Sequence, residues 1–354
     1  MADRLAGVPL APYTTLRTGG PARAFTQART QGELVAIVAE ADREREPVLV
    51  LGGGSNLVVS DDGFDGLVVR VATRGVEVTA RKSAADDGWV RVTVQAGEDW
   101  DALVARCVAE GWSGVECLSG IPGLVGSTPI QNVGAYGQDV SQTVAAVRVY
   151  DRRTGEVGDL AAAACGFAYR HSAFKHDPGR HMVLAVTYAL ERSPLSGPVA
   201  YKELAARLGV EIGARVPLAD AREAVLELRR GKGMVLDPDD PDARSAGSFF
   251  TNPVLGPEEA AALALRAPGH PRWDMPDGTV KIPAAWLIEN AGFPRGYERG
   301  RARISTKHTL ALTNPTGEAG AAELLALARE VRDGVHEKFG VWLVNEPVLV
   351  GLSL

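Results

Sequence analysis

The chain of 354 residues has neither an excess of positive charge nor a long apolar run. Its formal net charge is −6, so it lacks the basic footprint of a nucleic-acid-binding protein, and we expect no nucleic-acid partner. No apolar run approaches the roughly 20 residues of a membrane-spanning helix, and the first residues do not form the basic and then apolar pattern of a signal peptide. We therefore expect a cytoplasmic protein without a membrane partner.

Cysteine is also scarce. Cys107, Cys117 and Cys165 are odd in number and lack CxxC spacing, so they indicate neither a disulfide framework nor a zinc knuckle. We expect all three to be buried thiols, because free cysteine prefers protein interiors. The three histidines of residues 171–181 stand five apart, which suits neither one helical face nor a zinc site, so no metal is expected.

Lysine is the rarer of the two strongly basic residues, with seven Lys against 31 Arg. An ammonium is a compact point charge and a guanidinium is a planar fork, so a lysine kept in an arginine-rich chain can indicate a site that needs the point charge. Chance retention on a solvated surface is an equal alternative. The lysines considered in this way are Lys175, which lies inside a motif described below, and Lys232, Lys281 and Lys307.

The composition that remains is ordinary for a globular protein, with 45% hydrophobic and 23% charged residues. The length exceeds what one hydrophobic core usually serves, so two or three domains are expected. Thr30 and Glu33 form a predicted capping box at the start of a helix that ends before Pro47. Further helices are expected over residues 220–230 and 316–340, with short strands between helices. The pattern predicts mixed α+β structure.

A glycine-rich loop follows the predicted buried strand in the sequence VLVLGGGSNLVV. The backbone N–H groups of Gly52–Gly54 can converge on phosphate oxygens, because no side chain blocks them. No lysine follows the glycines, which argues against a P-loop, and the next segment is a predicted strand, which argues against a Rossmann fingerprint. The loop is a candidate pyrophosphate site, and a tight turn between two strands is the alternative.

The segment Leu118–Gln138 contains five glycines and no charged residue. Its glycines allow the backbone to approach a flat ligand closely, and Ser127, Thr128, Gln131 and Asn132 can hydrogen-bond the polar edge of a ring. A long buried connection is the alternative, but a loop of this length is uncommon unless it is functional. We therefore favour a site for a flat ring system.

Five motifs follow one another in the chain: LGGGSN, IPGLVGSTPIQNVGAYGQ, YRHSAFK, AGSFFTNP and WLVNEP. In this order they resemble the UDP-N-acetylenolpyruvoylglucosamine reductase family, and the resemblance covers nearly the whole chain. It implies a vanillyl-alcohol-oxidase-type FAD-binding fold of two α+β subdomains and a separate α+β substrate-binding domain. Residues 1–71 and 72–230 would form the two subdomains, residues 231–345 the substrate-binding domain, and residues 346–354 would return to the first subdomain.

The resemblance implies non-covalent FAD as the cofactor and NADPH as the co-substrate. The glycine loop would hold the FAD pyrophosphate, and the second glycine-rich segment would line the flavin. The residues assigned to FAD in this way are Leu51, Gly52, Gly53, Gly54, Ser55, Asn56, Ile121, Pro122, Gly123, Gly126, Ser127 and Gly134.

The implied reaction reduces UDP-N-acetylglucosamine enolpyruvate to UDP-N-acetylmuramate in peptidoglycan precursor synthesis. Hydride from the reduced flavin would reach the enolpyruvyl methylene carbon, and Ser248 would donate the proton. Arg170 would stabilise the charge that develops on the carboxylate side, and Glu346 would polarise the substrate or assist protonation. Outside their motifs, Arg170 would be interpreted as a salt-bridge partner, Ser248 as a turn residue and Glu346 as the partner of an arginine.

The long stretch between Arg170 and Ser248 resembles the type of reductase that has an extra substrate-covering segment, in which Tyr201 would be the gating tyrosine. A UDP diphosphate needs cations or amide groups around it. A monomer is expected. The residues that the resemblance places around the UDP-sugar are Tyr169, Tyr201, Lys232, Asn252, Lys281, Arg295 and His308.

Two other functions remain open. Another flavin-dependent oxidoreductase of the same superfamily would need neither Ser248 nor contacts with UDP. A non-catalytic sensor of a nucleotide sugar or a flavin would keep the fold and lose the chemistry. NADPH consumption on addition of the enolpyruvyl UDP-sugar distinguishes the reductase from both.

Overall fold

The computed structural model describes residues 3–79 and 88–354, and the chain divides into two compact units. The first unit consists of Met1–Gly7, Arg23–Gly53 and Asp65–Arg230. The second consists of Val8–Ala22, Gly54–Phe64 and Gly231–Leu354. The polypeptide therefore passes several times between the two units, and one of these passages falls inside the glycine-rich loop, between Gly53 and Gly54.

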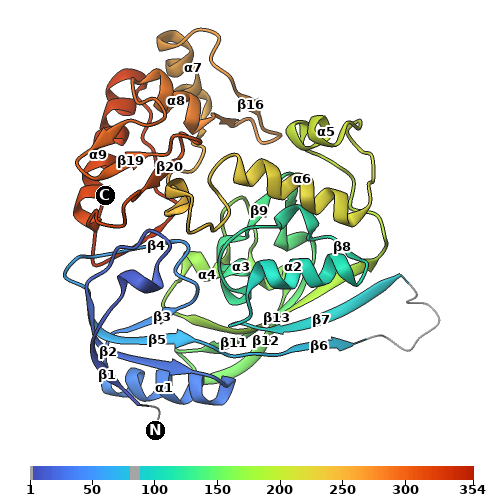
Figure 1. Ribbon diagram of the computed structural model, residues 1–354, viewed down its shortest axis with the longest axis vertical. Helices are drawn as coiled ribbons and strands as arrows, with labels where there is room; N and C mark the ends of the chain where they lie inside the picture. The colour runs from blue at the N-terminus through green and yellow to red at the C-terminus, as the bar shows by residue number, and fades with distance from the viewer. Residues whose placement is uncertain (1–2, 80–87) are drawn as a thin grey trace. The chain divides into compact units, whose positions relative to one another are not determined.

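The sheet with the most strands is antiparallel and lies in the first unit (Figure 1). Residues of its strand β7 (Trp89–Gln95) alternate between buried and more exposed positions, as expected for a strand with one face on the core. Val90, Val92 and Val94 are the buried residues of this strand. The other strands of the sheet are β6 (Val76–Thr79), β8 (Trp112–Ser113), β11 (Val144–Asp151), β12 (Glu156–Ala161) and β13 (His181–Arg192).

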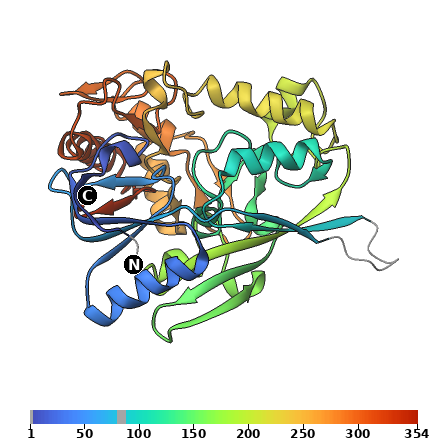
Figure 2. The same ribbon diagram turned by 60° about the horizontal axis from the view of Figure 1, so that its bottom comes forward.

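Helices α2 (Trp100–Ala109) and α6 (Leu218–Arg230) lie on one side of this sheet, as Figure 2 shows. Trp100 is 1% exposed, and its indole Nε1 donates to the carbonyl of Leu118 at 3.1 Å. This hydrogen bond fixes the start of the second glycine-rich segment to the helix layer. Helix α5 (Lys202–Leu208) packs on α6.

A second sheet has the strand order β1 (Leu5–Pro9), β2 (Pro21–Ala28), β5 (Phe64–Val71) and β3 (Val48–Leu51), with β3 and β5 parallel. Helix α1 (Gln31–Glu44) begins at the predicted capping box. The hydroxyl of Thr30 accepts from the Glu33 amide at 3.1 Å, and the Glu33 carboxylate accepts from the Thr30 amide at 3.2 Å. The capping box is therefore confirmed.

The second unit has two small antiparallel sheets and one long helix. Helix α9 (Ala321–Phe339) buries one face against the core of this unit through Leu324, Leu327, Ala328 and Val331. The remaining elements are β4 (Leu57–Val59), β14 (Ser245–Ser248), β15 (Val254–Leu255), α7 (Pro257–Arg266), β16 (Trp273–Asp274), β17 (Val280–Lys281), α8 (Ala284–Asn290), β18 (Glu298–Arg299), β19 (Ala302–Ile304), β20 (Ala311–Thr313) and β21 (Val348–Val350).

The boundaries of two helices differ from the sequence-based expectation. Helix α9 begins at Ala321 and not near residue 316, because Gly317 has a φ of +79° and the Asp61 carboxylate accepts from the Ala321 and Ala322 amides at 2.7 and 3.0 Å. Helix α6 begins at Leu218, two residues before the expected start. The Leu218 side chain is buried, and tertiary packing of this kind extends a helix beyond its sequence signals.

The three cysteines are free and buried, as predicted. Burial raises the pKa of the Cys107 thiol to about 12 and that of the Cys165 thiol to about 11. No helix among residues 3–79 and 88–354 is long and apolar enough to cross a membrane. The division into two FAD-binding subdomains and one substrate-binding domain remains a prediction.

Replacement of Thr30 by alanine should destabilise the first unit. It leaves the Glu33 amide without its side-chain acceptor, which typically costs about 1 kcal/mol. We expect the thermal midpoint to fall by roughly 2–4 °C, as measured by circular dichroism. Thr30→Ser keeps a hydroxyl acceptor and should match the wild type. Equal midpoints for Thr30→Ala and the wild type would contradict the role of the cap.

Candidate active site

The glycine-rich loop of the first unit is pressed against a second glycine-containing turn. A Cβ placed on Gly53 would lie 2.8 Å from the Cα and 3.2 Å from the carbonyl carbon of Gly123. Side chains essentially never tolerate such a distance to backbone atoms, so only glycine allows these two turns to lie this close. No side chain covers the backbone of Gly52 and Gly53, and bare backbone N–H groups are what an anionic ligand needs.

A cavity of about 420 Å³ adjoins these two turns within the first unit. Three arginines, Arg29, Arg70 and Arg74, contribute to its wall. One guanidinium group can donate two parallel hydrogen bonds to the oxygens of a phosphate, so the wall is suited to a diphosphate. The full lining consists of Gln27, Arg29, Gly52, Gly53, Arg70, Val71, Ala72, Arg74 and Leu124.

The second glycine-rich segment is built from short turns and single helical turns rather than from an extended loop. Gly126 permits a close contact, because a Cβ there would lie 2.6 Å from the Cβ of Ala96. Asn132 and Tyr136 adopt φ values of +43° and +50°, which non-glycine residues rarely adopt. Backbone strain of this kind concentrates at binding sites, where the surrounding structure holds it.

Arg170 is half-buried beside this segment. It has a φ of +52°, and its Nη2 donates to the carbonyl of Gly134 at 2.9 Å. Its guanidinium carbon lies 5.6 Å from the ring centre of Tyr169. The buried Arg229 of α6 adds positive charge to the same region, and burial lowers the pKa of Arg229 to about 10. Two cationic groups so close together favour an anionic ligand.

Tyr201 precedes α5 and contacts the second glycine-rich segment. Its ring meets that of Tyr136 edge to face, with the ring centres 5.5 Å apart and the planes at 88°. Burial raises the pKa of Tyr136 to about 12. Tyr136 was not predicted as a site residue, although it lies in the motif IPGLVGSTPIQNVGAYGQ.

Ser248 and Glu346 lie close together in the second unit. The Glu346 amide donates to the carbonyl of Phe249 at 2.8 Å, and Phe250 and Asn345 form an isolated β-bridge. Gly247 has a φ of +72°, and the fully buried Phe249 and Phe250 rings fix the turn that follows Ser248. This arrangement brings together two residues that are almost a hundred positions apart in the sequence.

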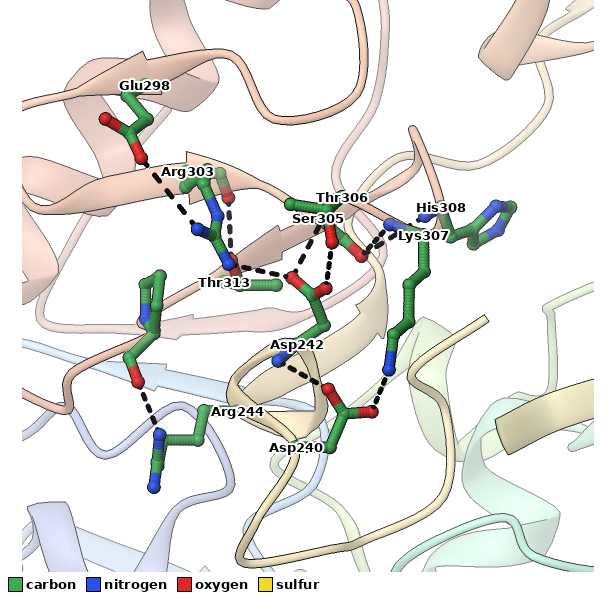
Figure 3. A network of polar contacts seen from close by, with 11 residues as sticks. Asp240, Asp242, Arg244, Glu298, Arg303, Ser305, Thr306, Lys307, His308 and Thr313 are labelled. Atoms are coloured by element: carbon green, nitrogen blue, oxygen red, sulfur yellow. Dashed lines mark hydrogen bonds and ion pairs between the residues drawn. The ribbon is translucent and has the colours of Figure 1, made fainter. Parts of the chain in front are cut away.

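The loop that carries Lys307 and His308 is held by the buried carboxylate of Asp242 (Figure 3). This carboxylate accepts from Arg303 Nη2 and from the Thr306 amide, each at 3.2 Å. Lys307 Nζ pairs with Asp240 Oδ2 at 2.8 Å. The imidazole of His308 points away from the network in Figure 3.

Known proteins resemble the chain over its full length. Residues 239–350 match the UDP-N-acetylenolpyruvoylglucosamine reductase, C-terminal domain, and residues 22–161 match an FAD binding domain. The UDP-N-acetylenolpyruvoylglucosamine reductase of Thermobifida fusca is 58% identical, with 98% of each chain covered. The protein of the same name from Streptomyces coelicolor is 56% identical, with 99% of this chain and 91% of that one covered.

The chain belongs to the UDP-N-acetylenolpyruvoylglucosamine reductase family. A crystal structure of the reductase from Thermus caldophilus aligns with a TM-score of 0.66 at 28% identity and covers 99% of both chains. The predicted family and fold class are thus confirmed, and the FAD binding domain confirms the predicted cofactor.

In this reductase, the other predicted site residues of the second unit lie in turns and at strand ends. Asn252 Oδ1 accepts from the Ala284 amide at 2.9 Å and so holds the start of α8. Lys281 Nζ lies 5.4 Å from the ring centre of the exposed Trp273, which the sequence analysis missed. Lys232 is half-buried just after α6, and Arg295 is exposed in the turn after α8.

Residues 54–56 of the glycine-rich loop belong to the second unit. Gly54 has a φ of +62°, and a Cβ there would lie 1.9 Å from the carbonyl oxygen of Tyr13, so only glycine fits. Asn56 Nδ2 donates to the carbonyl of Glu346 at 3.5 Å. Ser55 is half-buried between them.

Asp242→Asn should loosen the loop of Lys307 and His308 in a pH-dependent way. Burial raises the pKa of the Asp242 carboxyl, but the hydrogen bonds from Thr306 and the Arg303 guanidinium outweigh it and hold the pKa below its ordinary value. The carboxylate therefore stabilises the fold above its unfolded pKa, and this contribution is lost as the pH falls through the folded pKa.

At pH 7 the variant should be less stable than the wild type by about 2 kcal/mol, since hydrogen bonds to a buried charge are lost. Below about pH 4, where an unfolded aspartate begins to bind its proton, the difference should narrow. Chemical unfolding at both pH values measures it. A difference that stays constant over this range would show that the charge of Asp242 does not hold the loop.

Proposed function

We propose that the protein is an FAD-dependent oxidoreductase that uses NADPH to reduce UDP-N-acetylglucosamine enolpyruvate to UDP-N-acetylmuramate. The observation that carries the proposal is the 58% identity, over 98% of both chains, to a reductase named for this substrate. The close approach of Gly53 to Gly123 and the cationic cavity beside it support it independently, because both suit a dinucleotide cofactor.

The residues of the first unit fit FAD. Gly52 and Gly53 would present their amides to the pyrophosphate, with Arg29, Arg70 and Arg74 balancing its charge. Ile121, Pro122, Gly123, Gly126, Ser127 and Gly134 would line the flavin, and Leu51, Gly54, Ser55 and Asn56 would complete the loop. Bound FAD supplies the hydride that NADPH first delivers to it.

Three residues are proposed for the chemistry on the substrate. Arg170 is permanently cationic and would stabilise the charge that accumulates on the carboxylate side when the methylene carbon accepts hydride. Ser248 would donate the proton at the adjacent carbon. Glu346, held beside Ser248 by its hydrogen bond to Phe249, would polarise the substrate or assist this protonation.

The UDP-sugar is proposed to contact both tyrosines and cations. Tyr169 and Tyr201 present exposed rings for the nucleotide or the sugar. The residues with cationic or amide groups for the diphosphate are Lys232, Asn252, Lys281, Arg295 and His308. The substrate-covering segment would lie in the stretch between Arg170 and Ser248, with Tyr201 as its gating tyrosine.

The proposal extends to the oligomeric state, the location in the cell, the biological role and the domain division. We propose that the protein acts as a monomer in the cytoplasm, without a membrane or nucleic-acid partner, and that its product serves peptidoglycan synthesis and with it cell shape and division. We also propose the division into subdomains 1–71 and 72–230 and a substrate-binding domain of residues 231–345, with residues 346–354 returning to the first.

The proposal is tested by the two half-reactions of the purified protein. NADPH should bleach the bound flavin, and the enolpyruvyl UDP-sugar should restore its colour under anaerobic conditions. Ser248→Ala should keep the first step and slow the second by about 10²- to 10⁴-fold, the range typical of a lost general acid. Stopped-flow absorbance separates the two steps.

Thr251→Ala is the matched control, because it removes a nearby hydroxyl that has no proposed role. It should leave both half-reactions near their wild-type rates. A wild-type protein that the enolpyruvyl sugar does not reoxidise would refute the function and favour another flavoenzyme. A Ser248→Ala protein that reoxidises at the normal rate would refute only the role of Ser248.

A further inference from the structure

Glu116 carries a carboxylate in the interior of the first unit that no proposed step uses. The residue is 0% exposed and follows β8. Its Oε2 accepts from the Gly114 amide at 2.7 Å, while its Oε1 accepts from Gln138 Nε2 at 2.8 Å and from the Gly197 amide at 2.6 Å. Hydrogen bonds to a charged acceptor are the strong ones, and a carboxylate without them would not be buried.

Two of these donors belong to different functional segments. Gln138 ends the second glycine-rich segment, and its Oε1 also accepts from the Cys117 amide at 2.8 Å. Gly197 lies four residues before Tyr201. A Cβ on Gly197 would lie 3.2 Å from Gln138 Nε2, so the two segments meet closely at this carboxylate. One oxygen of Glu116 thus joins both segments.

The second glycine-rich segment and the segment before Tyr201 also touch at a second point. A Cβ placed on Gly137 would lie 2.8 Å from the Cβ of Ala200, which places the backbone of residue 200 directly on this turn. The rings of Tyr136 and Tyr201 meet edge to face one residue further on each side. The position of Tyr201 over the second glycine-rich segment is therefore set within a few residues of Glu116.

The base of the Tyr201 segment is anchored independently. Ser196 and Val199 donate from their amides to the carbonyls of Val216 and Ala214 at 2.7 and 2.9 Å. Val199 packs in a small buried cluster with Cys117, the neighbour of Glu116. Tyr201 itself is 47% exposed. The segment thus has a fixed base at residues 196–199 and an exposed ring at its far end.

We propose that Glu116 is a positioning residue for the step that consumes the UDP-sugar. Its carboxylate holds Gly197 and Gln138 at one point, and this sets the ring of Tyr201 against Tyr136. The inference rests on the proposed function in one respect, namely that Tyr201 contacts the substrate. Glu116 is fully buried, so it would act through Tyr201 and not by contact with the substrate or the cofactor.

The test is a double-mutant cycle of Glu116→Gln and Tyr201→Ala. The carboxamide keeps the size of the side chain, but its NH₂ group faces either the Gly114 amide or both the Gln138 and Gly197 donors. One or two of the three hydrogen bonds therefore become repulsions, and those that remain lose their charged acceptor. We expect Glu116→Gln to raise the KM for the UDP-sugar about tenfold, with kcat and the rate of flavin reduction by NADPH within about twofold of the wild type.

In the Tyr201→Ala background, Glu116→Gln should raise this KM by less than about twofold, because residues that act through one another show non-additive effects. Glu110→Gln, the same change at an exposed glutamate after α2, is the control and should leave all constants unchanged. Additive effects on KM would overturn the proposal. The proposal would also be overturned if Glu116→Gln slowed flavin reduction by NADPH about as much as it raised the KM for the UDP-sugar, because that result indicates a general structural role.

Hydrogen exchange provides a readout that does not depend on turnover. Glu116→Gln should speed amide exchange at residues 197–201 and leave β7 and β13 unchanged, and unchanged exchange at residues 197–201 would overturn the proposal. Gly197→Ala disturbs the same joint by crowding Gln138, and it should reproduce the faster exchange if the Glu116 variant does not fold. A wild-type protein that does not turn over the UDP-sugar refutes the proposed function, whereas the exchange result still decides the role of Glu116.

Discussion

The contact between Gly53 and Gly123 is the constraint on which the first unit depends. Two turns from distant parts of the sequence meet backbone to backbone, at a distance that a single methyl group would prevent. Because side chains are absent there, the amides of Gly52 and Gly53 remain available beside the cavity. Trp100 and the second glycine-rich segment are arranged around this contact, so the proposed cofactor site rests on a steric rule before any specific hydrogen bond is considered.

Electrostatics then determines what the two units can bind. A protein with a net charge of −6 does not attract anionic ligands over its whole surface, so local cations must do so. Arg29, Arg70 and Arg74 line the cavity, and Arg170 lies near the buried Arg229. In the second unit, Asp240 pairs with Lys307, and Asp242 accepts from Arg303 and Thr306. These contacts hold a loop in place, and the cations beside the two carboxylates reduce their repulsion of a diphosphate.

The sequence reveals those features whose signals are local. The capping box of Thr30 and Glu33 lies within four residues, and the glycine loop is a single run, so both could be predicted. The start of α9 at Ala321 was not predicted: Glu323 supplies a local signal through its hydrogen bond from the Gly320 amide, but the acceptor of the Ala321 amide is Asp61, 260 residues away. Arg70 and Glu116 were missed for the same reason: their partners and neighbours come from separate strands and turns. Ser248 and Glu346 have ordinary local sequences, and only the order of the motifs pointed to them.

The most direct test of this account is the affinity of Gly53→Ala for FAD. The added methyl group would clash with the backbone of Gly123, so the two turns must separate, which displaces the amides of Gly52 and Gly53. Titration of the apoprotein, followed by quenching of flavin fluorescence, should show an affinity at least about tenfold weaker, a loss of about 1.4 kcal/mol. Gly158→Ala, at an exposed strand position with open space around it, should bind FAD like the wild type. Wild-type affinity in Gly53→Ala would contradict the central claim.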